Sequence, residues 1–201
     1  MIFFETEADL THWFPLPLHW TDQNQDEMMQ WPVMCTEIVH QRHKAWWRLP
    51  RRLTLADRFL QLAEAHPVPS VPADQAFLYC DGPRMMPQPF YALAVQSEGE
   101  DHEAGLRITA QAADTNPVRP PEITPFHSER LGHGLRCIHY FGDPSDPGAS
   151  LNYGWWSEEH QVHASVRTVP PEAAWIRANL DICDDFARSM WLNPDPLGDS
   201  I

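Results

Sequence analysis

Histidine is the residue type best equipped for chemistry in this sequence. Eleven histidines are present, and imidazole both ligates metals and exchanges protons near neutral pH. His40 and His43 lie three apart on a predicted helix, with Glu37 one turn earlier, so a local metal-binding set is one interpretation and a polar helix face is the other. His160 and His163 enter a strand from a turn, and strand residues three apart face opposite sides, which makes a poor chelate.

A second group of histidines accompanies a glycine-flanked loop. His133 lies between Gly132 and Gly134, and His139 follows six residues later, a spacing that matches no local ligand motif. With His163, these side chains could line a cleft, which makes a metal-dependent small hydrolase one alternative function. The sequence contains no Gly-x-Ser-x-Gly and no complete nucleotide-binding glycine motif. We therefore predict no catalytic residue, no metal ligand and no cofactor.

Aromatic and basic residues gather in one short segment of this acidic chain. Trp46 and Trp47 precede Arg51 and Arg52, and tryptophan and arginine are enriched at the hot spots of protein interfaces. One interpretation is a helix end, where the helix dipole favours cations. The other is a docking site for an acidic protein surface, and on that basis we predict these four residues to bind a partner.

Alternation along a predicted hairpin places Trp156 among polar residues. Successive strand residues face opposite sides, so Trp155 belongs to the apolar side, whereas Trp156 shares the other side with His163 and Arg167. A large ring among polar neighbours is either covered by a helix or held for a partner. We therefore add Trp156, His163 and Arg167 to the predicted binding residues.

The last predicted helix has an acidic side made by Asp181, Asp184 and Asp185. Like charges at helical spacing repel one another, a small cost that solvent-facing helix surfaces tolerate. A solvated face is therefore the first interpretation. Pairing with Arg177 and Arg188, which lie one turn away, is the second, and capture of a basic partner is the third.

The elements that must position these residues change in type along the chain. Up to residue 70 the periodicity predicts an aromatic segment, a short helix ending before Pro32, and helices over 33–47 and 55–65 joined by a linker at 49–52. Later segments predict strands at 76–80, 90–96, 135–141, 151–157 and 161–169, with a helix over 100–113 and a long helix from 172 to 190. The pattern predicts an α+β fold: an antiparallel sheet flanked by helices over residues 71–201, with a helical N-terminal extension over residues 1–70 packed on it.

The predicted order after residue 76 resembles a known fold family. The segments that carry the resemblance are 134–141, 151–156, 162–166 and 182–190. Their order is similar to that of the PsbP-like α/β/α sandwich, and the chain also resembles uncharacterised proteins of high-GC Gram-positive bacteria. The resemblance implies an adaptor that binds other proteins, mostly without catalysis.

Composition limits the classes of partner and the cellular locations that we expect for this protein. The 201 residues carry a formal net charge of −14, which repels nucleic acid and anionic lipid, so we expect neither as a partner. No signal sequence and no apolar run long enough for a membrane helix is present. The four cysteines are far apart in the sequence, which indicates free thiols and a cytoplasmic location.

These observations favour a non-catalytic protein-binding adaptor or a subunit of a cytoplasmic bacterial assembly. Its partner would be another protein, not identified by the sequence, and a homo-oligomer is a further option. Two alternatives stay open: the metal-dependent small hydrolase with a histidine cluster, and an acidic immunity-type protein that neutralises a basic toxin by electrostatic steering.

Overall fold

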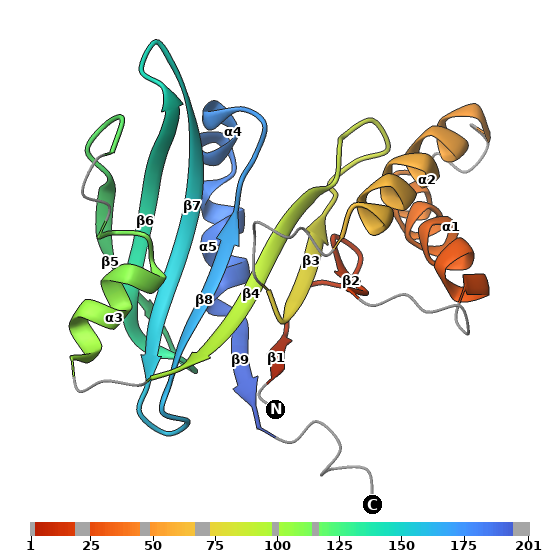
Figure 1. The fold of residues 1–201 in the computed structure, drawn as a ribbon. Coiled ribbons are helices and arrows are strands. Elements are labelled where there is room, and N and C mark those ends of the chain that lie inside the picture. The colour runs from red at the N-terminus through yellow and green to blue at the C-terminus, as the bar shows by residue number, and fades with distance from the viewer. Residues whose placement is uncertain are drawn as a thin grey trace, which may run out of the picture. The chain divides into compact units, whose positions relative to one another are not determined.

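The computed structural model describes residues 3–18, 25–44, 49–66, 73–97, 101–113 and 117–194, without the side chains of residues 25 and 49–54. Within these residues the chain is mixed α+β, with five helices and a large antiparallel sheet, as the sequence predicted (Figure 1). The chain forms two compact units, one of residues 9–90 and a larger one of residues 1–8 and 91–201. The division at residue 70 into an extension and a sandwich domain stays a prediction.

The larger unit is built on a sheet with the strand order β4-β8-β7-β6-β5. Its strands are β4 (Gln88–Gln96), which begins in the smaller unit, β5 (Glu122–Ser128), β6 (Gly132–Asp143), β7 (Asp146–Ser157) and β8 (Val162–Thr168). Strands β5 to β8 pair antiparallel in sequence order. The predicted hairpin is confirmed, since Trp156 of β7 is paired with His163 of β8.

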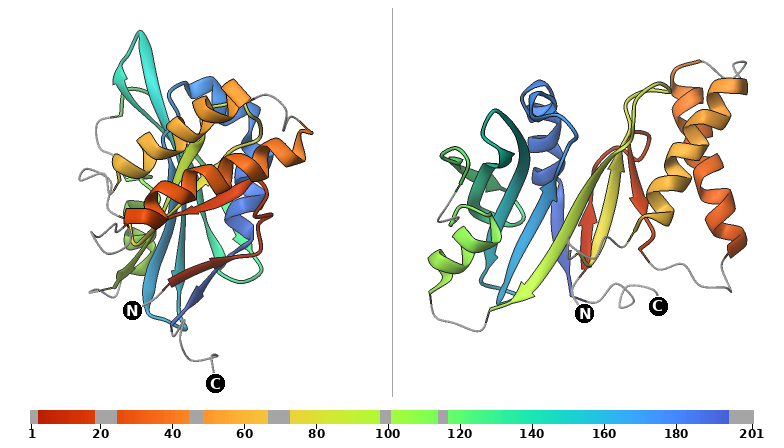
Figure 2. Two further views of the ribbon diagram at one scale, coloured as in Figure 1. Left: turned by 90° about the vertical axis from the view of Figure 1, so that its right-hand side faces the viewer. Right: turned by 45° about the horizontal axis from the view of Figure 1, so that its top comes forward.

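Helices lie on both faces of this sheet (Figure 1 and Figure 2). On one face, α3 (His102–Thr109) packs on β7, β8 and β6. On the other face lie α4 (Ala173–Ala178) and α5 (Leu180–Arg188), where the apolar side of β7 is buried. The two faces differ in chemistry because the strand alternation separates Tyr153 and Trp155 from Asn152 and Trp156.

The long C-terminal helix predicted over 172–190 is interrupted, and it ends two residues earlier than predicted. It is divided at Asn179, whose side-chain amide donates a 2.8 Å hydrogen bond to the Trp175 carbonyl and so takes over a helix-terminating role that asparagine favours. After α5 the chain forms β9 (Met190–Asn193), which pairs antiparallel with β1 (Phe3–Thr6). Met190, predicted as the last residue of the helix, is therefore the first residue of β9, and β1 and β9 form a two-stranded ribbon within the larger unit.

The smaller unit combines two strands with two helices. They are β2 (Trp13–Leu16), α1 (Gln25–Arg42), α2 (Leu49–Glu64) and β3 (Gln75–Tyr79). The helices pack on each other through their buried sides, where the rings of Trp31 and Phe59 meet edge to face with centroids 5.7 Å apart. Strand β2 pairs antiparallel with β3.

Two predicted boundaries in this unit are wrong. Helix α1 continues through Pro32 instead of ending there. Proline inside a helix costs about 3 kcal/mol, and the packing of α1 on α2, with Cys35 and Val39 fully buried, offsets that cost. Helix α2 begins at Leu49, so the predicted linker is its first turn, where Pro50 needs no hydrogen-bond donor.

Two further properties concern the described residues as a whole. None of their helices is both long enough and apolar enough to cross a membrane. All four cysteines are buried and unpaired, as the sequence predicted. Burial raises the pKa of the thiols of Cys80 and Cys137 to about 11 and that of Cys183 to about 12.

Candidate functional site

The face of the larger sheet that lies under α3 is unusually polar for a buried surface. Asn152, Ser150 and Ser165 are buried there. Asn152 donates hydrogen bonds to the Ser150 hydroxyl, at 3.0 Å, and to the Cys137 carbonyl, at 3.3 Å, while Ser165 donates to the Leu93 carbonyl. Because buried polar groups are costly unless they are hydrogen-bonded, this face is built for something other than a purely apolar contact.

Helix α3 covers one half of this face. The His102 ring stacks on Trp156 with ring centroids 3.9 Å apart and an interplanar angle of 12°. Trp156 also contacts His163, with ring centroids 4.8 Å apart, and the pKa of His163 is lowered by burial and, second, by the neighbouring His102. Of the two interpretations of Trp156, the structure therefore shows cover by a helix.

Glycines allow α3 to approach the strands closely. A Cβ atom at Gly105 would lie 2.3 Å from Nε2 of His163, and one at Gly154 would lie 3.1 Å from Cβ of Ala110. The predicted helix over 100–113 was in conflict with Gly105, because glycine is a poor helix former. The close helix-to-sheet approach explains why glycine occupies that position.

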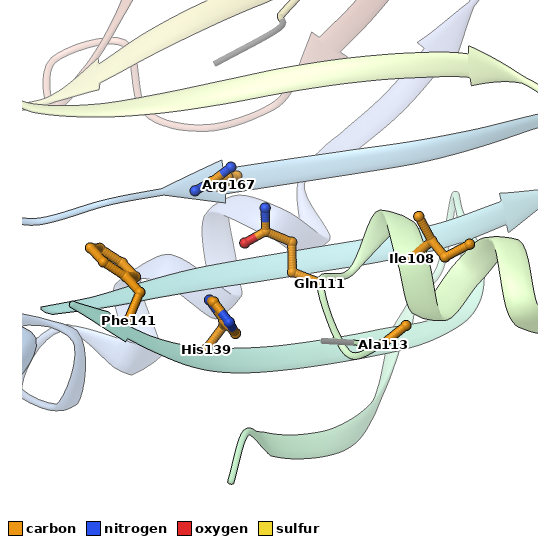
Figure 3. Close-up of a pocket in the computed structure, with 6 residues that line it drawn as sticks. All are labelled: Ile108, Gln111, Ala113, His139, Phe141 and Arg167. Carbon is orange, nitrogen blue, oxygen red and sulfur yellow. The ribbon is translucent and has the colours of Figure 1, made fainter. Parts of the chain in front are cut away.

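The other half of the polar face is open and forms a pocket of about 450 Å³ beyond the C-terminal end of α3. Figure 3 shows the side chains that line it, from the end of α3, from β6 and from β8. They are Ile108, Gln111, Ala113, His139, Phe141 and Arg167. The volume falls in the range of small-molecule sites, and all six residues belong to the larger unit.

Arg167 is the charged residue of this pocket. It is half-buried on β8, and its buried Nε atom has no hydrogen-bond partner among the described residues. Burial lowers the pKa of Arg167, an effect that the nearby Tyr91 partly opposes. Arginine nevertheless stays protonated in proteins, so the pocket contains a cation that no described carboxylate neutralises.

Gln111 places a second polar group beside Arg167. It follows α3 in a left-handed backbone conformation, with φ of 56°. Its carbonyl accepts a 3.6 Å hydrogen bond from the Cys137 thiol, and its side-chain oxygen accepts one of 3.4 Å from Ser150. The amide oxygen is thereby engaged with the sheet, which leaves the amide nitrogen as the donor that the described part of the chain does not use (Figure 3).

The apolar wall of the pocket is aromatic. Phe141 lies over Gly148 of β7, where a Cβ atom would come within 2.7 Å of the ring. The His139 ring runs nearly parallel to Phe141, at 23° with centroids 6.2 Å apart. Phe141 is 36% exposed and Ile108 is 67% exposed, so both present apolar surface at the mouth of the pocket.

A second hollow of the larger unit, about 660 Å³ in volume, has its charges already paired. Asp184 is buried there and accepts hydrogen bonds from Arg136, at 2.5 Å, and from the Tyr153 hydroxyl, at 2.7 Å, with Arg188 at 3.6 Å. The predicted solvated acidic face is therefore wrong for Asp184, and the predicted pairing with Arg188 is confirmed. Arg177 contacts Glu122 instead of Asp181.

The remaining predicted site residues lie apart from the pocket. Trp46 and Trp47 fall outside the described residues, as do the side chains of Arg51 and Arg52. His40 is buried in the smaller unit, whereas the exposed His43 contacts the Asp81 carbonyl.

The three histidines predicted to line one cleft, His133, His139 and His163, have different neighbours in the structure. His133 faces His127 across β5 and β6, with ring centroids 4.7 Å apart, and only His139 reaches the pocket. Among the described residues, no three His, Cys, Asp or Glu side chains are grouped to hold a metal ion. The sequence prediction thus found Arg167, but it missed Gln111 and Phe141, because no local pattern joins the end of α3 to β6.

Comparisons with known proteins add no family: no protein-family model and no curated protein matches this sequence.

Proposed function

We propose that this chain is a non-catalytic binding protein whose larger unit holds a small anionic ligand in the Arg167 pocket. One observation carries the proposal: the guanidinium of Arg167 is half-buried beside an open pocket, and no described residue bonds its Nε atom. Leaving a buried donor unsatisfied costs about 1–3 kcal/mol. An oxyanion in the pocket would neutralise the positive charge of the guanidinium.

The surroundings of Arg167 support binding more than catalysis. The pocket lining offers donors from Arg167 and Gln111 and one imidazole, His139. The Cys137 thiol, which donates to the carbonyl of the lining residue Gln111, is buried, and its pKa of about 11 keeps it in the unreactive protonated form. A pocket with a few hydrogen-bond donors and an apolar wall is the arrangement of a binding site.

The broader predictions from the sequence stay proposals beside this one. They are a protein-binding adaptor role, a cytoplasmic location and membership of the PsbP-like fold family. The hydrolase alternative finds no support in the grouping of the described metal-ligating residues. The immunity-type alternative depends on the net charge of −14 and on a small stable fold.

Binding can be tested at the Arg167 Nε–H group itself by NMR of the full ¹⁵N-labelled chain. The Arg167→Gln variant assigns the resonance, and sodium benzoate and inorganic phosphate are the probes. We expect a saturable shift of this resonance with at least one of the two anions, because an oxyanion bound to the guanidinium changes the charge beside the Nε–H group. Arg107→Gln is the matched control, since Arg107 is exposed on α3 and does not line the pocket. No saturable shift with either anion would refute the proposed function.

A further inference from the structure

The charges around the pocket are suited to a single negative charge. Arg167 is the one fully charged side chain among the described lining residues. Helix α3 turns its C-terminal end toward the pocket through Ile108 and Gln111, and a helix C-terminus carries partial negative charge. Sites for dianionic phosphate commonly use the opposite end of a helix. A dianion would therefore leave one charge uncompensated here, whereas a monoanion matches Arg167.

The donor geometry fits a carboxylate. A guanidinium presents parallel N–H groups that bind the two carboxylate oxygens together. Gln111, held by Ser150 and Cys137, supplies a further N–H₂ group from the side of α3. In Figure 3 the Gln111 side chain extends between Arg167 above it and the strand that carries His139 and Phe141. The anion would thus lie between β8 and the end of α3.

The apolar wall indicates what the carboxylate is attached to. The pocket of about 450 Å³ is far larger than a bare carboxylate needs. Phe141 is fixed over Gly148 and stacked with His139, so its exposed face is flat and pre-positioned. Aromatic rings associate in offset or edge-to-face pairs that contribute about 0.5–1.5 kcal/mol beyond the burial of area. A planar ring attached to the carboxylate would use this wall.

We propose that the ligand of the Arg167 pocket is a monocarboxylate with a flat aromatic body, its carboxylate on Arg167 and Gln111 and its ring against Phe141. This inference rests on the proposed function and specifies its ligand class. The same chemistry is presented by a free aryl carboxylic acid and by a C-terminal phenylalanine of a polypeptide.

Isothermal titration of the full chain with matched probes tests the ligand class. The probes are 2-naphthoate, 2-naphthyl phosphate, acetate and a short peptide that ends in phenylalanine with a free carboxylate. We expect 2-naphthoate to bind about tenfold more tightly than either acetate or 2-naphthyl phosphate, because it alone among these three combines one charge with a ring. A peptide affinity above that of 2-naphthoate would identify a polypeptide terminus as the source of the carboxylate, and the reverse order would identify a free acid.

Two variants of the protein measure how much the ring of the ligand contributes to binding beside its carboxylate. Phe141→Ala should weaken the binding of 2-naphthoate about fivefold and leave the binding of acetate unchanged. Ile182 is an equally exposed apolar residue outside the pocket, so Ile182→Ala should change the binding of neither probe. Tighter binding of the phosphate, or no effect of Phe141→Ala, would overturn the ligand class while the proposed function stands. No binding of any probe would overturn both.

Discussion

Gly105 determines how closely α3 can lie on the sheet. Replacing it with alanine would place a methyl group 2.3 Å from Nε2 of His163, whose ring is held against Trp156. Overpacking of this kind costs about 1–3 kcal/mol, which equals or exceeds the gain of about 1 kcal/mol that alanine brings to a helix. We expect Gly105→Ala to lower the free energy of unfolding, measured by urea denaturation.

The same substitution should increase stability instead of lowering it once the clash with His163 is removed. In a His163→Ala background, Gly105→Ala should raise the free energy of unfolding by up to about 1 kcal/mol, because only the helix propensity changes. Equal effects in the two backgrounds would show that the contact between Gly105 and His163 does not limit the approach of α3.

His163 also makes stability depend on pH. Its pKa in the folded protein lies below the ordinary value because of burial and then of His102, so the unfolded chain binds its proton first as the pH falls. The free energy of unfolding therefore decreases as the pH drops below about 6.5, where an unfolded histidine titrates, and stops decreasing below the folded pKa. Above about pH 6.5 the full contribution of the neutral His163 to the free energy of unfolding is present.

We expect His163→Asn to lose less thermal stability than the wild type when the pH is lowered from about 7.5 to about 5.5. The melting temperature at the two pH values measures this difference. His133→Asn is the control, because its exposed side chain has no such burial and should retain the wild-type dependence. Identical losses in wild type and His163→Asn would contradict the prediction.

At the scale of elements, buried charge attaches α5 to the sheet. Asp184 of α5 bonds Arg136 of β6 and Tyr153 of β7. Removing one partner of a buried ion pair costs about 3–5 kcal/mol, because the other charge stays buried. A half-exposed partner such as Arg188, 3.6 Å from Asp184, contributes about 0–1 kcal/mol.

Arg136→Met should therefore destabilise the protein several times more than Arg188→Met. Guanidinium denaturation of the two variants beside the wild type measures both changes in the free energy of unfolding. Similar losses would mean that solvent screens Asp184 despite its burial, and that the helix is attached by its apolar side alone.

The elements also show what could be predicted from the sequence. The alternation over β7 and β8 predicted correctly that Trp156, His163 and Arg167 share one side of the sheet, because strand geometry is local. The continuation of α1 through Pro32 was not predictable, since it depends on packing against α2. The pocket was half predictable, because Arg167 follows from β8 but Gln111 reaches it only through the packing of α3.

At the scale of the whole molecule, the reactivity of the cysteine thiols shows whether either unit opens. Cys35 and Cys80 lie in the smaller unit, Cys137 and Cys183 lie in the larger one, and all four are fully buried. Burial also raises each pKa, and the thiolate is the reactive form. We expect a thiol reagent such as Ellman's to label none of them rapidly in the native protein and all four in denaturant. Rapid labelling of two thiols in buffer would show that one unit opens readily on its own.

The pairing of β1 with β9 has a consequence for synthesis. Phe3 is opposite Asn193, so this ribbon joins segments separated by nearly the whole described chain, and the smaller unit occupies a continuous stretch between β1 and most of the larger unit. Because chains emerge from the ribosome in sequence order and domains fold as units, residues 9–90 can fold early. Phe4, which is buried in the finished protein and paired with Leu192, has no β9 partner until Leu192 has been translated, and it is available to chaperones over that interval.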